Sequence, residues 1–85
     1  MKPVITVRFN RELIRLLKSH RLTENQIRSV LHTIKTNPKS PSLRLHKLSG
    51  TNNYALSVDK NIRIIAHFEN DIILLLRIGS HDEVY

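Results

Sequence analysis

The sequence predicts an α+β domain in which two N-terminal helices pack on one face of an antiparallel sheet, in the order β-α-α-β-β-β-β. Two observations lead to this prediction. Apolar residues recur with the helical period of 3.6 in the first half of the chain, and from residue 43 onward they alternate with a period of two. The chain has 85 residues, so a single domain spanning 1–85 is expected.

The first half of the chain predicts one strand and two helices. Residues 2–9 (KPVITVRF) are rich in β-branched side chains, as strands are, and Asn10 is a suitable N-cap for a helix that begins at Arg11. Thr23 and Gln26 have the spacing of a capping box, so they mark the second helix more clearly. The two prolines of residues 36–42 end it. The faces expected to be buried carry Leu13, Leu16, Leu17 and His20 in the first helix and Ile27, Val30, Leu31 and Ile34 in the second, while Arg11, Arg15 and Lys18 share the outer face of the first.

The second half predicts four strands joined by short turns. Alternating segments cover 43–50, 54–59 and 62–69, with turns at 50–53, 60–61 and 70–71. The last segment, 72–78, is apolar on both faces until Arg77. It is therefore expected in the interior of the sheet, with a neighbouring strand on each side.

The charge of the chain is its most informative bulk property. Fourteen Lys and Arg against seven Asp and Glu give a net charge of +7, which favours a polyanionic partner such as RNA or DNA. There is no cysteine, which excludes disulfides and thiolate metal sites and fits a reducing compartment. No apolar run reaches the ~18 residues of a membrane span, and no secretory signal is visible, so a cytoplasmic protein is expected.

One face of the predicted sheet collects arginine and histidine. Its members are Arg44, His46, Arg63, His67 and Arg77, with Ser57 and Asp59 between them. The planar guanidinium suits a phosphate, and imidazole suits proton transfer near neutral pH. These side chains together predict a site that binds a phosphate and moves protons beside it. The alternative interpretation is an ordinary solvated face, since exposed sheet faces are polar in any case.

The C-terminal residues 77–85 (RIGSHDEVY) place a histidine and a tyrosine directly after the last strand. A tail leaving that strand can fold over the rim of the basic face, where His81 and Tyr85 would reach a bound phosphodiester. The alternative is a frayed, solvated terminus, which is common for the last residues of a domain.

Three stretches resemble the RelE/ParE superfamily of bacterial toxins, and within it the RelE- and YafQ-like mRNA interferases. They are residues 45–50 (LHKLSG), the hairpin 54–68 (YALSVDKNIRIIAHF) and the ending 78–85 (IGSHDEVY). The resemblance implies a RelE-like fold and a toxin that cleaves mRNA in the ribosomal A site without a metal or other cofactor. It also implies a cognate antitoxin as partner, in a hetero-oligomeric toxin–antitoxin complex.

The resemblance also implies roles for individual residues. His81 matches a C-terminal histidine of acid–base catalysis, and Tyr85 matches the terminal aromatic residue. Arg63 matches an arginine that contacts the phosphate, and His46 a histidine before the hairpin. The further cations expected to bind RNA phosphates are Arg44, Lys47, Lys60 and Arg77.

The chain departs from the family pattern in the first strand of the hairpin. YafQ-like members carry a histidine where this chain has Leu56 or, in another register, Ser57. RelE-like members carry lysines where this chain has Ala55 and Ser57. His67 or Asp59 are the candidates to compensate. Non-nucleolytic alternatives are a ParE-like gyrase poison, a catalytically weak antitoxin-binding module and a plain nucleic-acid binder.

A metal-dependent nuclease is disfavoured by the spacing of the histidines. None of the five forms an i, i+4 pair, and no cluster of carboxylates accompanies them. His20 and His32 lie on the predicted helices and are expected to be packing or surface residues.

Overall fold

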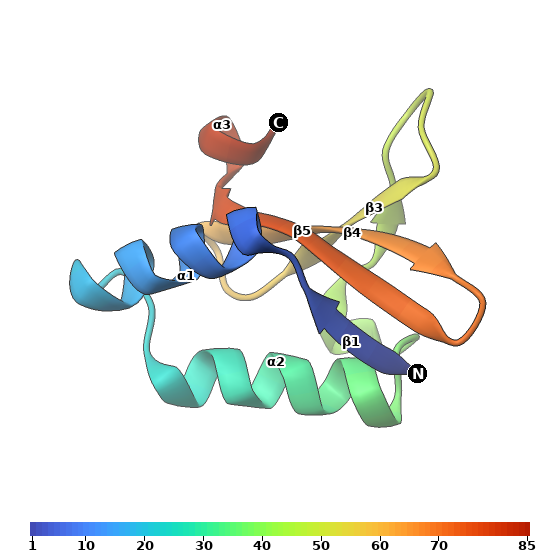
Figure 1. Cartoon of the computed structure of the whole chain (residues 1–85), viewed down its shortest axis with the longest axis horizontal. Coiled ribbons are helices and arrows are strands. Elements are labelled where there is room, and N and C mark those ends of the chain that lie inside the picture. Colours follow the sequence, from blue (N-terminus) through green and yellow to red (C-terminus); the bar gives the residue numbers. More distant parts are fainter.

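A computed structural model describes all residues, 1–85. The α+β class and the predicted order of two helices and five strands are confirmed (Figure 1). In chain order the elements are β1 (Lys2–Ile5), α1 (Val7–Lys18), α2 (Glu24–Thr36), the 3-10 turn η1 (Pro41–Leu43), β2 (His46–Lys47), β3 (Asn53–Ser57), β4 (Ile62–Glu69), β5 (Ile72–Ser80) and α3 (His81–Val84). No helix is both long enough and apolar enough to cross a membrane.

The sheet has the strand order β1-β5-β4-β3-β2. Strands β2 to β5 form the predicted antiparallel meander, whereas β1 pairs with β5 in parallel, so the sheet is mixed. The parallel pairing follows from the path of the chain, because both helices and the whole meander separate β1 from β5. β5 therefore has a neighbour on each side, as its apolar composition predicted.

The main core lies between the sheet and the helices α1 and α2. Phe9 and Ile34 from the helices and Ile64, Ile73 and Leu75 from the strands are fully buried in one cluster. Figure 1 shows α2 along one side of the sheet and α3 on the other. The two sides of the sheet thus differ: one is buried under α1 and α2, and the other is covered only by the short C-terminal helix.

The first helix begins four residues earlier than predicted. Thr6, not Asn10, is the N-cap, and its hydroxyl accepts a hydrogen bond from the Phe9 N–H. The same hydroxyl donates to the carbonyl of Leu75 at 2.8 Å, which fixes the cap to β5. His20, predicted on the buried face, lies beyond the helix end and is exposed, with a left-handed φ of 61°.

The second helix has the predicted start. Thr23 accepts a hydrogen bond from the Gln26 N–H, and the Gln26 side chain accepts one from the Thr23 N–H at 2.9 Å. This reciprocal pair satisfies two backbone donors of the first turn.

The strand predicted over 43–50 is mostly absent. Leu43 closes η1 and is buried in the core, Arg44 has a left-handed φ of 48°, and only His46 and Lys47 pair with β3. Pro41 at the start of η1 favours this local turn over an extended strand. The turn between β3 and β4 is also longer than predicted, because β3 ends at Ser57 and β4 begins at Ile62.

Candidate active site

We call the side of the sheet away from α1 and α2 the helix-free face, because it carries only the short α3. A cross-strand row of four residues lies at its middle. His46 pairs with Ala55, Ala55 with Ile65, and Ile65 with Arg77, so all four side chains lie on one face of the sheet. Val84 of α3 packs against Ala55 and Ile65 in a second, smaller apolar cluster. α3 therefore covers the centre of this row and leaves the exposed His46 beside it.

A second cross-strand row lies two residues further along β3 and β4, next to the turn that joins these strands. Ser57 pairs with Arg63, and Arg63 pairs with Gly79. Arg44 and Lys60 join Ser57 and Arg63 around a cavity of about 200 Å³, which Ser42, Val58 and Asp59 complete. Three of the cations predicted from the sequence thus gather at one cavity. Its charge excess is positive, since Asp59 is the only acid in the lining.

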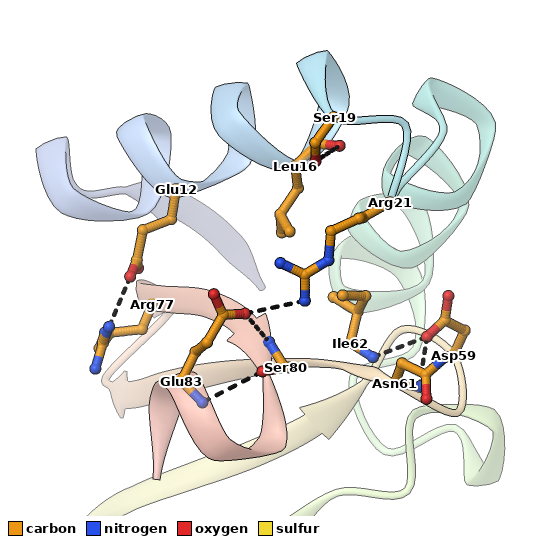
Figure 2. Close-up of polar contacts among 10 residues, drawn as sticks. All are labelled: Glu12, Leu16, Ser19, Arg21, Asp59, Asn61, Ile62, Arg77, Ser80 and Glu83. Atoms are coloured by element: carbon orange, nitrogen blue, oxygen red, sulfur yellow. Dashed lines mark hydrogen bonds and ion pairs between the residues drawn. The ribbon is translucent and has the colours of Figure 1, made fainter.

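Arg63 is held in place by the turn that precedes its strand. Its Nη1 donates to the carbonyl oxygens of Asp59, at 2.5 Å, and Ile62, at 3.2 Å. The Asp59 carboxylate in turn accepts from the N–H groups of Asn61 and Ile62, both at 2.8 Å (Figure 2). Asp59 also accepts from the side-chain amide of Gln26 at 3.2 Å. Asp59 therefore organises the turn and orients Arg63, and its carboxylate is already engaged.

The C-terminal helix packs closely over Gly79. A Cβ at Gly79 would lie 3.2 Å from Glu83 Cβ, Glu83 Oε1 and Val84 Cγ1, so a larger residue would push the helix away. α3 begins immediately afterwards, with Ser80 as its N-cap. Because Gly79 pairs with Arg63, the register places the start of α3 on the same face as the Arg63 side chain.

His81 and Tyr85 form a pair on the outer side of α3. Their ring centroids are 4.2 Å apart, and the planes are nearly perpendicular, at 89°. The two residues are one helical turn apart, which brings their side chains together. Both are exposed, so a substrate could reach them. His81 Nδ1 lies 3.5 Å from the Asp82 carboxylate, and no hydrogen bond joins His81 to Arg63.

Glu83 anchors this helix at its first turn. Its Oε1 accepts from the Ser80 N–H at 2.8 Å and from Arg21 Nη2 at 3.1 Å (Figure 2). The Ser80 hydroxyl accepts from the Glu83 N–H, which completes a capping box. These bonds, the Ser80 N–H first, lower the pKa of Glu83 to about 2. The spacing of Ser80 and Glu83 is a signal of this capping box in the sequence, and it was not among the predicted features of the tail.

Arg77 is not free to bind a phosphate in this arrangement. Its Nη2 donates to Glu12 Oε2 of α1 at 2.7 Å, and Glu12 Oε1 accepts from the Ile78 N–H at 3.2 Å. Both side chains are mostly buried. The predicted role of Arg77 as a phosphate ligand therefore competes with Glu12, a partner that the sequence analysis did not identify.

Two other residues predicted for the site, Lys47 and His67, lie apart from the cavity. Lys47 follows His46 in β2 and pairs with Tyr54, and because successive side chains of a strand point to opposite faces, it lies on the helix side. His67 lies on the helix-free face but pairs with Asn53 at the far end of the hairpin, where its Nδ1 is 3.2 Å from Asn53 Oδ1. Neither joins the group around Arg63.

The hairpin strand β3 offers no proton-transfer group to this face. Leu56, one of the two positions compared with the family histidine, is buried in the main core on the helix side. Asn53, Ala55 and Ser57 are the β3 residues on the helix-free face. Nowhere in the structure do three His, Asp or Glu side chains cluster in a way that could hold a metal ion.

Several solved toxin structures match the chain over nearly its full length. A copper-bound mutant toxin from Helicobacter pylori matches with a TM-score of 0.85 and 22% identity, and covers 100% of this chain and 99% of its own. YafQ in the Escherichia coli DinJ–YafQ toxin–antitoxin complex gives 0.81 and 14%, covering 99% and 96%. A YoeB/ParE toxin from Agrobacterium tumefaciens gives 0.78 and 13%, covering 95% and 99%.

This chain has the RelE-like toxin fold. The fold expected from the resemblance is thereby confirmed. No family model and no curated protein matches the sequence. Such low identities with high structural similarity mean that the fold is shared while most side chains differ. The roles of individual residues in the RelE-like fold must therefore be argued from their own geometry.

Proposed function

We propose that the chain is the toxin of a type II toxin–antitoxin pair and an endoribonuclease that cleaves mRNA in the ribosomal A site. One observation carries the proposal. The cationic cavity of Arg44, Lys60 and Arg63 includes a residue, Arg63, that pairs with Gly79 directly beneath α3, the helix beside which His81 and Tyr85 form their pair. Phosphodiester cleavage needs a phosphate-binding group and a proton-transfer group, and this cavity and the exposed imidazole of His81 are suited to these two roles.

The proposed reaction uses the 2′-oxygen of the RNA itself. A base takes the proton of the 2′-hydroxyl, the oxygen attacks the adjacent phosphorus, and the bond to the 5′-oxygen breaks. The products are a 2′,3′-cyclic phosphate and a 5′-hydroxyl, which receives a proton from an acid. No step requires a metal ion or another cofactor.

The residues divide into two roles. His81 serves as the acid or the base, a contribution of typically ~10²–10⁴-fold. Arg63, with Arg44 and Lys60, offsets the charge on the phosphorane, where one positioned donor contributes about 10²–10³-fold. Tyr85 supports the reacting nucleotide from its place beside His81. His46 stands in the row under α3 as a second imidazole on this face.

The proposed partners are a cognate antitoxin, the mRNA and the ribosome, which places the protein in the cytoplasm. A similar toxin, YafQ, was crystallised with DinJ as a toxin–antitoxin complex. The net charge of +7 would attract an acidic antitoxin segment as well as RNA. An antitoxin that covers the helix-free face or displaces α3 would block the reaction.

A non-nucleolytic function is the second candidate. β3 supplies Asn53, Ala55 and Ser57 to the helix-free face and neither the histidine nor the lysines of the family pattern, so the site has fewer proton-transfer groups than that pattern. A ParE-like gyrase poison or a weakly catalytic antitoxin-binding module would tolerate this loss. Translation-dependent mRNA cuts support the nuclease, whereas DNA breaks at gyrase sites support the poison.

Inducible expression of site variants tests the assignment of residues. His81→Ala and Arg63→Ala should relieve growth inhibition and lower the yield of mapped mRNA ends by at least ~10²-fold. Arg28→Ala is the control, since Arg28 is an exposed cation on α2 whose partner is the neighbouring Glu24. Equal toxicity and equal cleavage from all four proteins would overturn the assignment.

The chemistry has its own test on programmed ribosomes. An mRNA whose attacking nucleotide carries 2′-hydrogen in place of 2′-hydroxyl should not be cut, because the nucleophile is missing. The all-ribose mRNA is the control. Cleavage of the deoxy substrate at an undiminished rate would rule out the 2′-oxygen mechanism.

A further inference from the structure

We propose that Arg21 is a positioning residue for the reaction: through Glu83 it holds α3 on the sheet and so fixes His81 and Tyr85. Arg21 lies in the loop between α1 and α2, 62 residues before Glu83. It belongs to no element that carries a predicted site residue. The inference rests on the proposed function and assigns to it a residue outside the site.

α3 needs an external support because it is very short. It has four residues, His81–Val84, and a single helical turn is unstable by itself. It also stands at the C-terminus, where chains commonly fray. Val84 is its one buried side chain, in a cluster with Ala55 and Ile65. Apolar packing of α3 therefore rests on one residue.

The contact between Arg21 and Glu83 adds the missing support. Arg21 Nη2 and Ser80 N–H donate to the same Glu83 Oε1, at 3.1 and 2.8 Å (Figure 2). The ion pair is therefore joined to the capping box that starts α3. No other hydrogen bond or ion pair connects α3 to the helices α1 and α2 or their loop. Arg21 is the link between this helix and the first half of the chain.

The Arg21–Glu83 ion pair is strong enough to affect the position of α3 but too weak to decide whether the whole chain folds. Both side chains are 46% exposed, and exposed ion pairs shift an equilibrium by up to about fivefold. Loss of such a pair would leave the core intact. It would let α3 leave its place over Gly79 more often, and His81 and Tyr85 would move together because their rings are in contact.

The surroundings of the pair contain the other charges that could replace it. Arg21 and Glu83 line a cavity of about 230 Å³ with Glu12, Arg15 and Arg77. Arg77 is engaged by Glu12 at 2.7 Å, so it is not available to Glu83. Arg15 has no ion-pair partner in the structure and is the only cation nearby that could substitute. Arg15→Gln combined with Arg21→Gln is therefore the stronger variant.

The experiment compares Arg21→Gln, Arg21→Gln with Arg15→Gln, and Arg21→Lys with wild type. The full chain is assayed on ribosomes programmed with mRNA, and docking of α3 is followed by hydrogen exchange at the Tyr85 N–H, which donates to the His81 carbonyl at 3.1 Å. The control is Arg28→Gln, which removes the exposed ion pair with Glu24 on α2.

We expect kcat to fall by up to about fivefold in Arg21→Gln and by at least as much in the double variant, with KM changed less than about twofold. Exchange at Tyr85 should quicken by a similar factor, and Arg21→Lys should recover most of both. Arg28→Gln should match wild type. Unchanged exchange in the double variant would overturn the link, and faster exchange with unchanged kcat would overturn the positioning role. A wild-type protein that cuts no RNA would overturn the proposed function instead.

Discussion

At the scale of the residue, Arg63 and Arg77 differ in the partners to which their guanidinium groups already donate hydrogen bonds. Nη1 of Arg63 donates to two backbone carbonyls, which orients the guanidinium group. The other N–H groups of Arg63 are left for a ligand. Arg77 gives its Nη2 to Glu12, and its Nε is buried without a partner. Arg63 is therefore available to a ligand at the cavity, whereas Arg77, which pairs with Glu12 of α1, is not.

The pairing of Glu12 with Arg77 leads to a prediction about stability. Glu12→Gln would leave a mostly buried guanidinium without its counter-charge and weaken the bond to the Ile78 N–H. Removing one partner of such a pair costs about 1–3 kcal/mol of the free energy of unfolding. Urea denaturation followed by circular dichroism measures this loss.

The matched control for that experiment is Glu24→Gln. Glu24 pairs with Arg28 at 3.6 Å on the surface of α2, where both side chains are more than two-thirds exposed. Exposed helix pairs contribute about 0.3–0.5 kcal/mol. Equal losses from Glu12→Gln and Glu24→Gln would mean that the Glu12–Arg77 pair is as weak as a surface pair.

At the scale of the element, sequence patterns predicted those features that depend on near neighbours. The Thr23–Gln26 box lies within four residues, and it marked the start of α2 correctly. The start of α1 was missed because Thr6 is held by Leu75, 69 residues away. No local pattern reports such a contact.

The same distinction applies to the candidate site. The arginine and histidine alternation placed Arg63, His46 and His67 on one face, as the register has them. It could not reveal that Arg77 pairs with Glu12, which lies 65 residues away in the sequence. It also could not reveal that β2 stops after Lys47.

α3 carries a prediction about pH. The pKa of Glu83 lies at about 2, below the usual 4.5, because the Ser80 N–H and then Arg21 stabilise the carboxylate. Its contribution to the docking of α3 is therefore fully present above pH 4.5 and is lost as the pH falls toward 2. Carbon-detected NMR of the Glu83 carboxyl should give a midpoint near 2 in the wild-type protein.

In Arg21→Gln that midpoint should rise but stay below 4.5, since the Ser80 N–H, the larger cause, remains. A Glu83 midpoint at 4.5 in the wild-type protein would mean that the capping box does not form in solution.

At the scale of the whole molecule, the net charge of +7 comes from cations on the helices, such as Arg11, Arg15 and Lys18 of α1, as well as from the sheet and its loops. Arg44, Lys60 and Arg63 are the cations that gather around one cavity. The only acid in its lining, Asp59, is bonded to two backbone N–H groups. RNA should therefore be bound mainly by these cations, with Lys47 on the other face contributing little.

The salt dependence of RNA binding tests this distribution of charge. Each phosphate that a cation neutralises adds about 0.7 to the slope of log K against log salt for single-stranded RNA, because bound counterions are released. Arg44→Ala and Lys60→Ala should each reduce the slope by about that amount, whereas Lys47→Ala should leave it unchanged. The binding partner is a short RNA with a 2′-hydrogen at the cleavage position, so that it is not consumed. Equal reductions from all three variants would mean that RNA reads the total charge of the molecule and not one face of its sheet.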